Sequence, residues 1–82
     1  MSVKIYTTST CHWCKVAKEY FDDNEIEYEE YNVEFDHEKA AEMVQKSGQR
    51  GVPVIDINGT IIIGFDKKTI DENIDNIKSE NT

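Results

Sequence analysis

The sequence has no long apolar run and no excess of positive charge, and it contains only two cysteines. No apolar stretch approaches the roughly 20 residues that cross a bilayer, and no apolar leader precedes the strand-like residues 3–6. With 9 Lys and Arg against 17 Asp and Glu, the net charge of −8 argues against nucleic acid or an anionic membrane as a partner. We therefore expect one cytoplasmic, monomeric domain spanning residues 1–82 that binds neither.

The two cysteines, Cys11 and Cys14, lie directly after this strand-like segment. If a helix begins there, the unpaired N–H groups and the dipole of its first turn favour a thiolate on Cys11. In a Cys-X-X-Cys motif placed this way, the pKa of the leading thiol falls from about 8.5 to roughly 3.5–7.5, and the second thiol can close a disulfide. We therefore predict thiol–disulfide exchange, with Cys11 as the attacking thiolate and Cys14 as the resolving thiol.

A structural pair or a zinc site is the competing interpretation of these cysteines. Tetrahedral zinc needs four ligands, usually Cys and His, and only His12 and His37 could complete the set. His12 lies between the two cysteines and cannot easily turn toward the same metal ion. We therefore expect no metal site.

The first half of the chain reads as strand, helix, strand. Residues 3–6 alternate as a strand does, and residues 7–10 supply turn and N-cap side chains. Residues 12–23 place their apolar side chains on one helical face. Residues 26–33 read as a second strand whose alternation slips near Glu30, which predicts a change of face or a bulge.

The second half of the chain reads as helix, hairpin, helix. Asp36 can cap a helix that stops at Gly48, and Asn58-Gly59 between two aliphatic runs predicts a type I′ hairpin. Asp66 can cap a last helix, whose apolar residues are Ile70, Ile74 and Ile77. The order β-α-β-α-β-β-α predicts an α/β fold: a four-stranded mixed sheet with helices on both faces and Cys11 at the carboxyl end of a strand.

Three separated motifs carry a resemblance to a known family. Residues 6–14 resemble the first strand and dithiol motif of the glutaredoxins, which have the thioredoxin fold. Residues 47–53, ending in Val52-Pro53, resemble the loop of that family that ends in Val-Pro, and residues 64–66 resemble its glycine-aspartate loop. The order and spacing of these motifs match over nearly the whole chain.

The resemblance implies glutathione as co-substrate, with glutathionylated or disulfide-containing proteins as partners. In the family, the proline matching Pro53 follows a cis peptide bond and faces the dithiol, and the backbone of the residue matching Val52 pairs with glutathione. Gln49 or Arg50 would hold the glycine carboxylate, and the segment at Asp66 would receive the γ-glutamyl end. The full set of implied glutathione contacts is Tyr6, His12, Trp13, Gln49, Arg50, Val52, Pro53, Gly64, Phe65 and Asp66.

Some of these side chains have a second interpretation. Tyr6 could simply pack within its strand, and His12 could be an exposed spacer rather than a cation near the thiolate. Trp13, in the first helical turn, is predicted to be exposed and to offer a contact face to a partner or a tripeptide.

Departures from the family pattern indicate two alternative functions. Thr8 occupies a position where many glutaredoxins have Lys. Phe65 in the glycine-aspartate loop makes the chain resemble redoxins that are reduced by the flavin-dependent thioredoxin reductase and that donate electrons to a reductase or peroxidase. His12 stands where many members have Pro, and members without that Pro can bridge a [2Fe–2S] cluster between two protomers.

Overall fold

The computed structural model describes the backbone of residues 2–80 and the side chains of residues 2–75. Its elements follow the predicted order and are β1 (Val3–Thr7), α1 (His12–Asp23), β2 (Glu29–Asn32), α2 (His37–Ser47), β3 (Val54–Ile57), β4 (Thr60–Ile63) and α3 (Lys67–Glu80). None of the described helices combines the length and the apolar character needed to cross a membrane.

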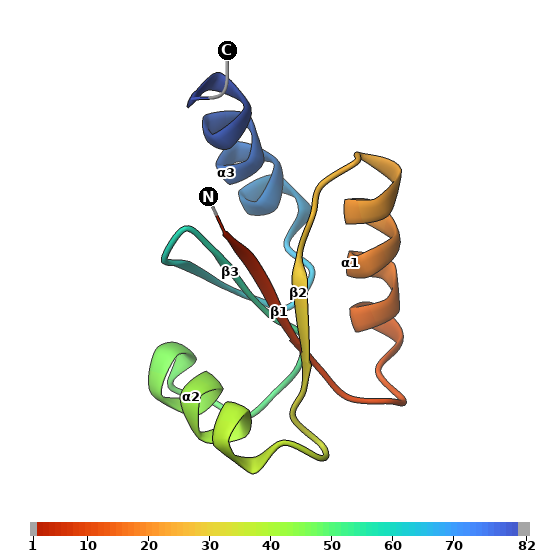
Figure 1. Cartoon of the computed structure of the whole chain (residues 1–82), viewed down its shortest axis with the longest axis vertical. Helices are drawn as coiled ribbons and strands as arrows, with labels where there is room; N and C mark the ends of the chain where they lie inside the picture. The colour runs from red at the N-terminus through yellow and green to blue at the C-terminus, as the bar shows by residue number, and fades with distance from the viewer. Residues whose placement is uncertain (1, 81–82) are drawn as a thin grey trace.

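The four strands form one mixed sheet in the order β2-β1-β3-β4 (Figure 1). β1 and β2 are parallel and joined through α1, whereas β3 pairs antiparallel with both β1 and β4. The carboxyl ends of β1 and β2 and the start of β3 therefore lie at the same end of the sheet. The loops that follow or precede these strand ends carry the dithiol and the Val52-Pro53 segment.

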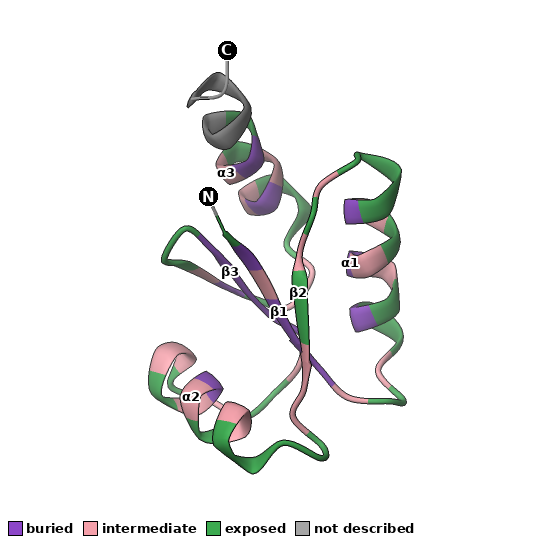
Figure 2. Ribbon diagram, in the orientation of Figure 1, coloured by how far each residue is buried: buried purple, intermediate pink, exposed green. Residues whose placement is uncertain are grey.

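The helices cover both faces of the sheet, as predicted, and each face has its own core (Figure 2). One core joins α1 and α3 to the sheet, and its buried residues are Val3, Ile5, Ala17, Phe21, Ile55, Ile57, Ile62, Ile70 and Ile74. The other joins α2 to the opposite face through Tyr6, Met43 and Val54. The side chain of Ile77, predicted to lie on the apolar face of α3, is outside the described residues.

Local signals place most of the element ends correctly. The Asp36 carboxylate accepts a hydrogen bond from the Lys39 N–H at 3.1 Å and caps α2, which ends at Gly48 with a left-handed φ of 73°. Asn58 and Gly59 have φ values of 51° and 95°, as a type I′ turn requires. The N-cap of α1 is Cys11 itself rather than one of residues 7–10, because its sulfur accepts the N–H bond that a cap side chain would accept.

The second strand is shorter than predicted and contains no bulge in its pairing with β1. β2 begins only at Glu29, and its register with β1 is continuous over four residue pairs. The preceding Ile26 is held by its N–H bond to the Phe21 carbonyl at 2.8 Å and packs with Tyr28 against the core under α1. Tyr31 packs against the opposite core, so the slip in the pattern marks a change of face between a loop and a short edge strand.

Candidate active site

The dithiol lies at the start of α1, where the sequence predicts it. Cys11 has extended backbone angles (φ −83°, ψ 110°), and its Sγ accepts a hydrogen bond from the Cys14 N–H at 3.1 Å. The two cysteines form a disulfide, with their Cα atoms 5.2 Å apart. An N–H group aimed at this sulfur, together with the helix N-terminus, favours the thiolate after reduction.

Burial differs between the two sulfur-bearing residues. Cys14 is only 1% exposed, whereas Cys11 is partly exposed at the end of the loop that follows β1. An incoming disulfide can therefore reach Cys11, and Cys14 can reach only a sulfur already bound to Cys11. This difference in burial suits the predicted roles, in which the first cysteine attacks and the second resolves.

A polar groove runs from the dithiol along α1 and β2. Lys18 and Glu30 both line it and form an ion pair at 2.9 Å, and the Thr7 hydroxyl donates to the same Glu30 oxygen at 2.8 Å. Burial opposes ionisation of Glu30, but the hydrogen bonds from Lys18 and Thr7 outweigh it and lower the pKa of this carboxyl. The charge of Lys18 is thus largely neutralised beside the site. The sequence pattern marks Glu30 only as the point where the strand alternation slips and gives no sign of this pairing.

The Val52-Pro53 peptide bond is cis, as the resemblance implies, and Pro53 is buried. The Pro53 carbonyl accepts a hydrogen bond from the Gly64 N–H at 2.8 Å, and Gly64 has a φ of 77° that glycine adopts without strain. This bond fixes the loop before β3 to the loop after β4. The two loops that the resemblance assigns to glutathione are therefore adjacent.

Gln49 is already engaged within its own loop. Its side-chain amide donates to the Gly51 carbonyl at 3.0 Å and accepts from the Gly51 N–H at 2.5 Å. The hydroxyl of Ser47 ties the same segment to the end of α2 by donating to the Gln49 carbonyl at 3.0 Å. Arg50, in contrast, is exposed and forms no ion pair with any residue in the described part of the chain.

Trp13 is 55% exposed, which confirms the predicted exposure. Its ring stacks on Phe65, with centroids 6.3 Å apart and planes 15° apart, and exposed His12 packs against its edge at 5.3 Å. Phe65 also meets the edge of the Tyr20 ring at 5.8 Å. An aromatic surface therefore connects the dithiol turn to the loop before α3. Asp66 caps α3, and its carboxylate accepts from the Thr69 hydroxyl at 2.8 Å.

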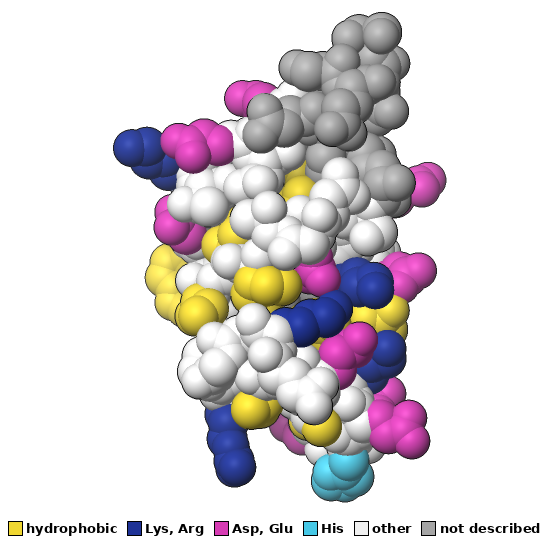
Figure 3. All heavy atoms as spheres, turned by 90° about the vertical axis from the view of Figure 1, so that its left-hand side faces the viewer, with side chains coloured by type: hydrophobic (Ala, Val, Ile, Leu, Met, Phe, Trp, Pro, Cys, Tyr) yellow, Lys and Arg dark blue, Asp and Glu magenta, His cyan; other side chains and the backbone are white. Residues whose placement is uncertain are grey.

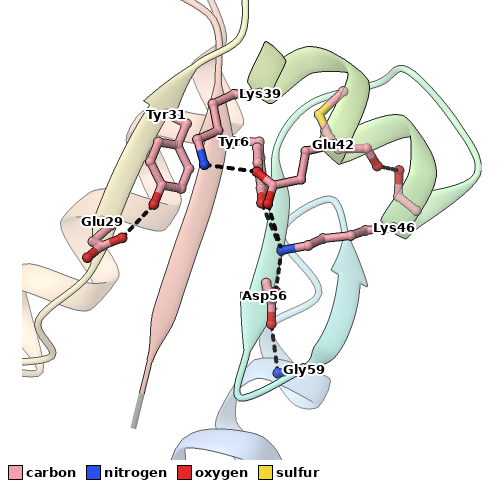
Figure 4. Close-up of polar contacts among 10 residues, drawn as sticks. Tyr6, Glu29, Tyr31, Lys39, Glu42, Lys46, Asp56 and Gly59 are labelled. Carbon is pink, nitrogen blue, oxygen red and sulfur yellow. Dashed lines mark hydrogen bonds and ion pairs between the residues drawn. The ribbon is translucent and has the colours of Figure 1, made fainter. Parts of the chain in front are cut away.

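Tyr6 packs under α2 and does not line the groove at the dithiol, which favours its interpretation as a packing residue. The side chain is fully buried under α2, and Lys46 donates to its hydroxyl at 3.0 Å and to Asp56 at 2.9 Å (Figure 4). Burial raises the pKa of Tyr6 even though Lys46 opposes the shift, and the hydrogen bonds to Tyr6 and Asp56 raise the pKa of Lys46. This network fixes α2 to the sheet.

The described part of the chain contains no cluster of side chains that would support metal binding. No group of three or more His, Cys, Asp and Glu side chains there is placed to hold an ion.

Two relatives are similar in sequence over most of their length. A glutaredoxin-like 8.6 kDa protein in a rubredoxin operon of Clostridium pasteurianum is 48% identical over 73 residues, which cover 89% of this chain and 97% of the relative. Glutaredoxin 3 of Escherichia coli K12 is 34% identical over 65 residues, covering 79% and 78% of the two chains.

Solved structures share the fold. A thioredoxin-like protein matches with a TM-score of 0.86 at 22% identity, over 90% of this chain and 95% of the other. The NrdH-redoxin of Escherichia coli, described as glutaredoxin-like with a thioredoxin-like activity profile, matches with a TM-score of 0.75 at 28% identity, over 88% and 93%. A buckwheat glutaredoxin in complex with glutathione matches with a TM-score of 0.76 at 25% identity, over 95% and 76%.

The Glutaredoxin family model matches residues 3–62, which contain the dithiol, the cis-proline loop, the first three strands and all but the last residue of β4. Together with the 48% identity to the clostridial glutaredoxin-like protein, this match shows that the chain belongs to the glutaredoxin family.

Proposed function

We propose that this thiol–disulfide redoxin reduces protein disulfides and glutathione mixed disulfides with electrons from glutathione. The observation that carries the proposal is the pair of sulfurs at the start of α1, one partly exposed and receiving an N–H bond, the other buried. A reducing compartment such as the cytoplasm suits this chemistry, because free thiols persist there.

The reaction begins with the Cys11 thiolate attacking one sulfur of the target disulfide. A new bond forms to Cys11, the old S–S bond breaks, and the departing thiolate takes up a proton. Cys14 then loses its proton and attacks Cys11, which releases the second thiol and leaves the Cys11–Cys14 disulfide. Two glutathione molecules supply the two electrons that reduce this disulfide and leave as oxidised glutathione. In the monothiol route, glutathione resolves the mixed disulfide on Cys11 directly.

The proposed glutathione site extends from the dithiol across the cis-proline loop. The Val52 backbone would pair with the peptide-like part of glutathione, Arg50 would bind its glycine carboxylate, and the N–H groups at the start of α3 would receive the γ-glutamyl end. The hydrogen bond between Gly64 and Pro53 supports this assignment because it holds the two loops together. The buckwheat glutaredoxin–glutathione complex, which shares the fold, also supports it.

Turnover of a glutathionylated substrate, with glutathione and glutathione reductase as the electron supply, tests the proposal. The parallel assay supplies thioredoxin reductase alone. We expect Cys11→Ser to abolish both activities, and Cys14→Ser to keep deglutathionylation while losing protein-disulfide reduction. Activity in Cys11→Ser would overturn the assignment of the nucleophile.

Reduction by a flavin-dependent thioredoxin reductase is the second candidate, and the exposed Trp13–Phe65 surface favours it. Aromatic side chains beside the redox disulfide suit a protein partner, because they bury a large area at a small entropic cost. The match to NrdH-redoxin points the same way. Activity with thioredoxin reductase but none with glutathione would establish this function and remove glutathione from the site.

A further inference from the structure

A groove on the outer side of α2 is used by neither the dithiol nor the proposed glutathione contacts, apart from Arg50. Its walls are Val33 and the α2 residues Ala40, Ala41 and Val44, with the buried Met43 beneath and Arg50 as the single cation among its lining residues. The small alanine side chains leave the space that larger ones would fill. Figure 3 shows the side of the molecule that carries α2, where small groups of hydrophobic side chains lie among charged ones.

Two residues of the groove connect it to segments of the active site. The Val33 N–H donates to the carbonyl of Thr7 at 2.9 Å, and Thr7 is the last residue of β1, directly before the loop that leads to Cys11. Arg50 lies in the loop that leads to Val52 and the cis peptide bond. A polypeptide held at Cys11 and extending across the cis-proline loop therefore runs toward this groove.

The lining chemistry selects one kind of occupant. Apolar walls bind an aliphatic side chain, and an arginine without an ion pair in the described residues binds a carboxylate through two parallel hydrogen bonds. Glutathione cannot supply both, because its only side chain besides the peptide-like backbone is the thiol that reacts with Cys11. A protein substrate can supply an aliphatic residue and an acidic residue on the same flank of its cysteine.

We propose that the groove receives the segment of a substrate protein that flanks the target cysteine, with an aliphatic side chain against Ala40, Ala41 and Val44 and a carboxylate on Arg50. This inference rests on the proposed disulfide-reductase function but not on the identity of the reductant. It assigns a sequence preference to protein substrates that a small glutathione disulfide does not experience.

Symmetric disulfide dimers of short peptides test the preference. Each peptide has one cysteine. In the first peptide Leu and Glu follow the cysteine, in the second they precede it, and in the third they are replaced by Ser and Lys. The full chain is reduced beforehand and mixed with each dimer in a single turnover, so that no glutathione or reductase takes part. We expect the dimer with Leu and Glu on one flank to react about tenfold faster than the Ser–Lys dimer, a size typical of one apolar contact.

The variant Ala41→Glu separates the groove from the rest of the site. Ala41 is exposed, so the new carboxylate is tolerated by the fold but opposes an acidic peptide and fills the groove. We expect this variant to lose the peptide preference and to keep the wild-type rate with the disulfide of mercaptoethanol, which carries no carboxylate for Arg50 to bind. Thr60→Glu, an equal charge change at the exposed start of β4, is the matched control and should retain the preference.

The outcomes distinguish the two proposals. Equal rates for all three dimers, or a preference that persists in Ala41→Glu, would overturn the groove assignment. Failure of the wild-type protein to reduce any dimer would instead remove the disulfide-reductase function itself.

Discussion

Replacing Gln49 with alanine tests whether this residue binds glutathione or holds the loop that does. Its amide makes two hydrogen bonds to Gly51, at 3.0 Å and 2.5 Å. At about 0.5–1.5 kcal/mol each, and toward the lower end because the segment is exposed, their loss costs about 1–2 kcal/mol. That energy corresponds to roughly a 5- to 30-fold smaller ratio of ordered to open loop, if the loop opens locally. Because Val52 follows directly, the pairing surface for substrate is lost with it.

The assay has one arm with glutathione and one without. The glutathione arm measures the rate at which a glutathionylated substrate is reduced. The arm without glutathione measures the rate of insulin reduction driven by dithiothreitol. If Gln49 positions the loop, Gln49→Ala lowers kcat/KM in both arms by the same factor, which is at most roughly 30-fold. Gln49→Glu keeps the hydrogen-bond acceptor but not the donor, so its kcat/KM should lie between those of the wild type and Gln49→Ala. Asn24→Ala removes an amide that bonds only the Tyr20 carbonyl and should leave both arms unchanged.

A different result would refute this reasoning. If Gln49→Ala raised KM for glutathione alone, with kcat and the dithiothreitol arm unchanged, the side chain would contribute only binding to glutathione. The contacts to Gly51 would then be dispensable for the loop. Gly51→Ala gives an independent check, because an added Cβ would lie 2.7 Å from the Gln49 amide oxygen and force it to move.

Three further predictions concern stability, each read from urea unfolding. Lys46→Met should lower the free energy of unfolding by about 2 kcal/mol, because the nearly buried Asp56 loses its ion pair. The loss is smaller than for a fully buried pair because Lys46 is partly exposed. The pKa values of Tyr6 and Lys46 are both raised in the fold, so their contribution is complete below about pH 10 and should be lost as the pH rises further, less so in Tyr6→Phe. Gly48→Ala should cost about 1 kcal/mol, because its φ of 73° strains a side chain although the space around it is open. An unchanged urea midpoint in Lys46→Met or Gly48→Ala, or equal alkaline loss in the wild type and Tyr6→Phe, would contradict the corresponding prediction.

Elements with a strong local signal could be predicted from the sequence almost to the residue. The helix at the dithiol, the cap at Asp36, the stop at Gly48 and the Asn58-Gly59 turn depend on neighbours within a few positions. The second strand depends instead on which face each residue covers. Ile26 and Tyr28 were counted as strand because they alternate, but their packing against α1 decides their conformation.

The surroundings of the site could not be read from the sequence for the same reason. Tyr6, Lys46 and Asp56 are far apart in the chain, and only the packing of α2 on β1 and β3 brings them together. The pairing of Lys18 with Glu30 likewise requires the parallel placement of β2 beside β1. The motif predicts which cysteine is the nucleophile, whereas the fold determines which charged side chains lie near it.

The charged side chains near Cys11 contribute little to stabilising its thiolate. Lys18, which lines the groove beside the dithiol, is neutralised by Glu30, and Thr8 stands where many family members have a lysine. Exposed Lys15 also lines this groove, and at the start of α1 the Cys14 N–H points at the Cys11 sulfur. Backbone groups in fixed positions are not removed by screening, as exposed side-chain charges are. We therefore expect the reactivity of Cys11 to depend mainly on the residues that start the helix. We propose that Arg50, the cis-proline loop and the aromatic surface select among reductants and substrates.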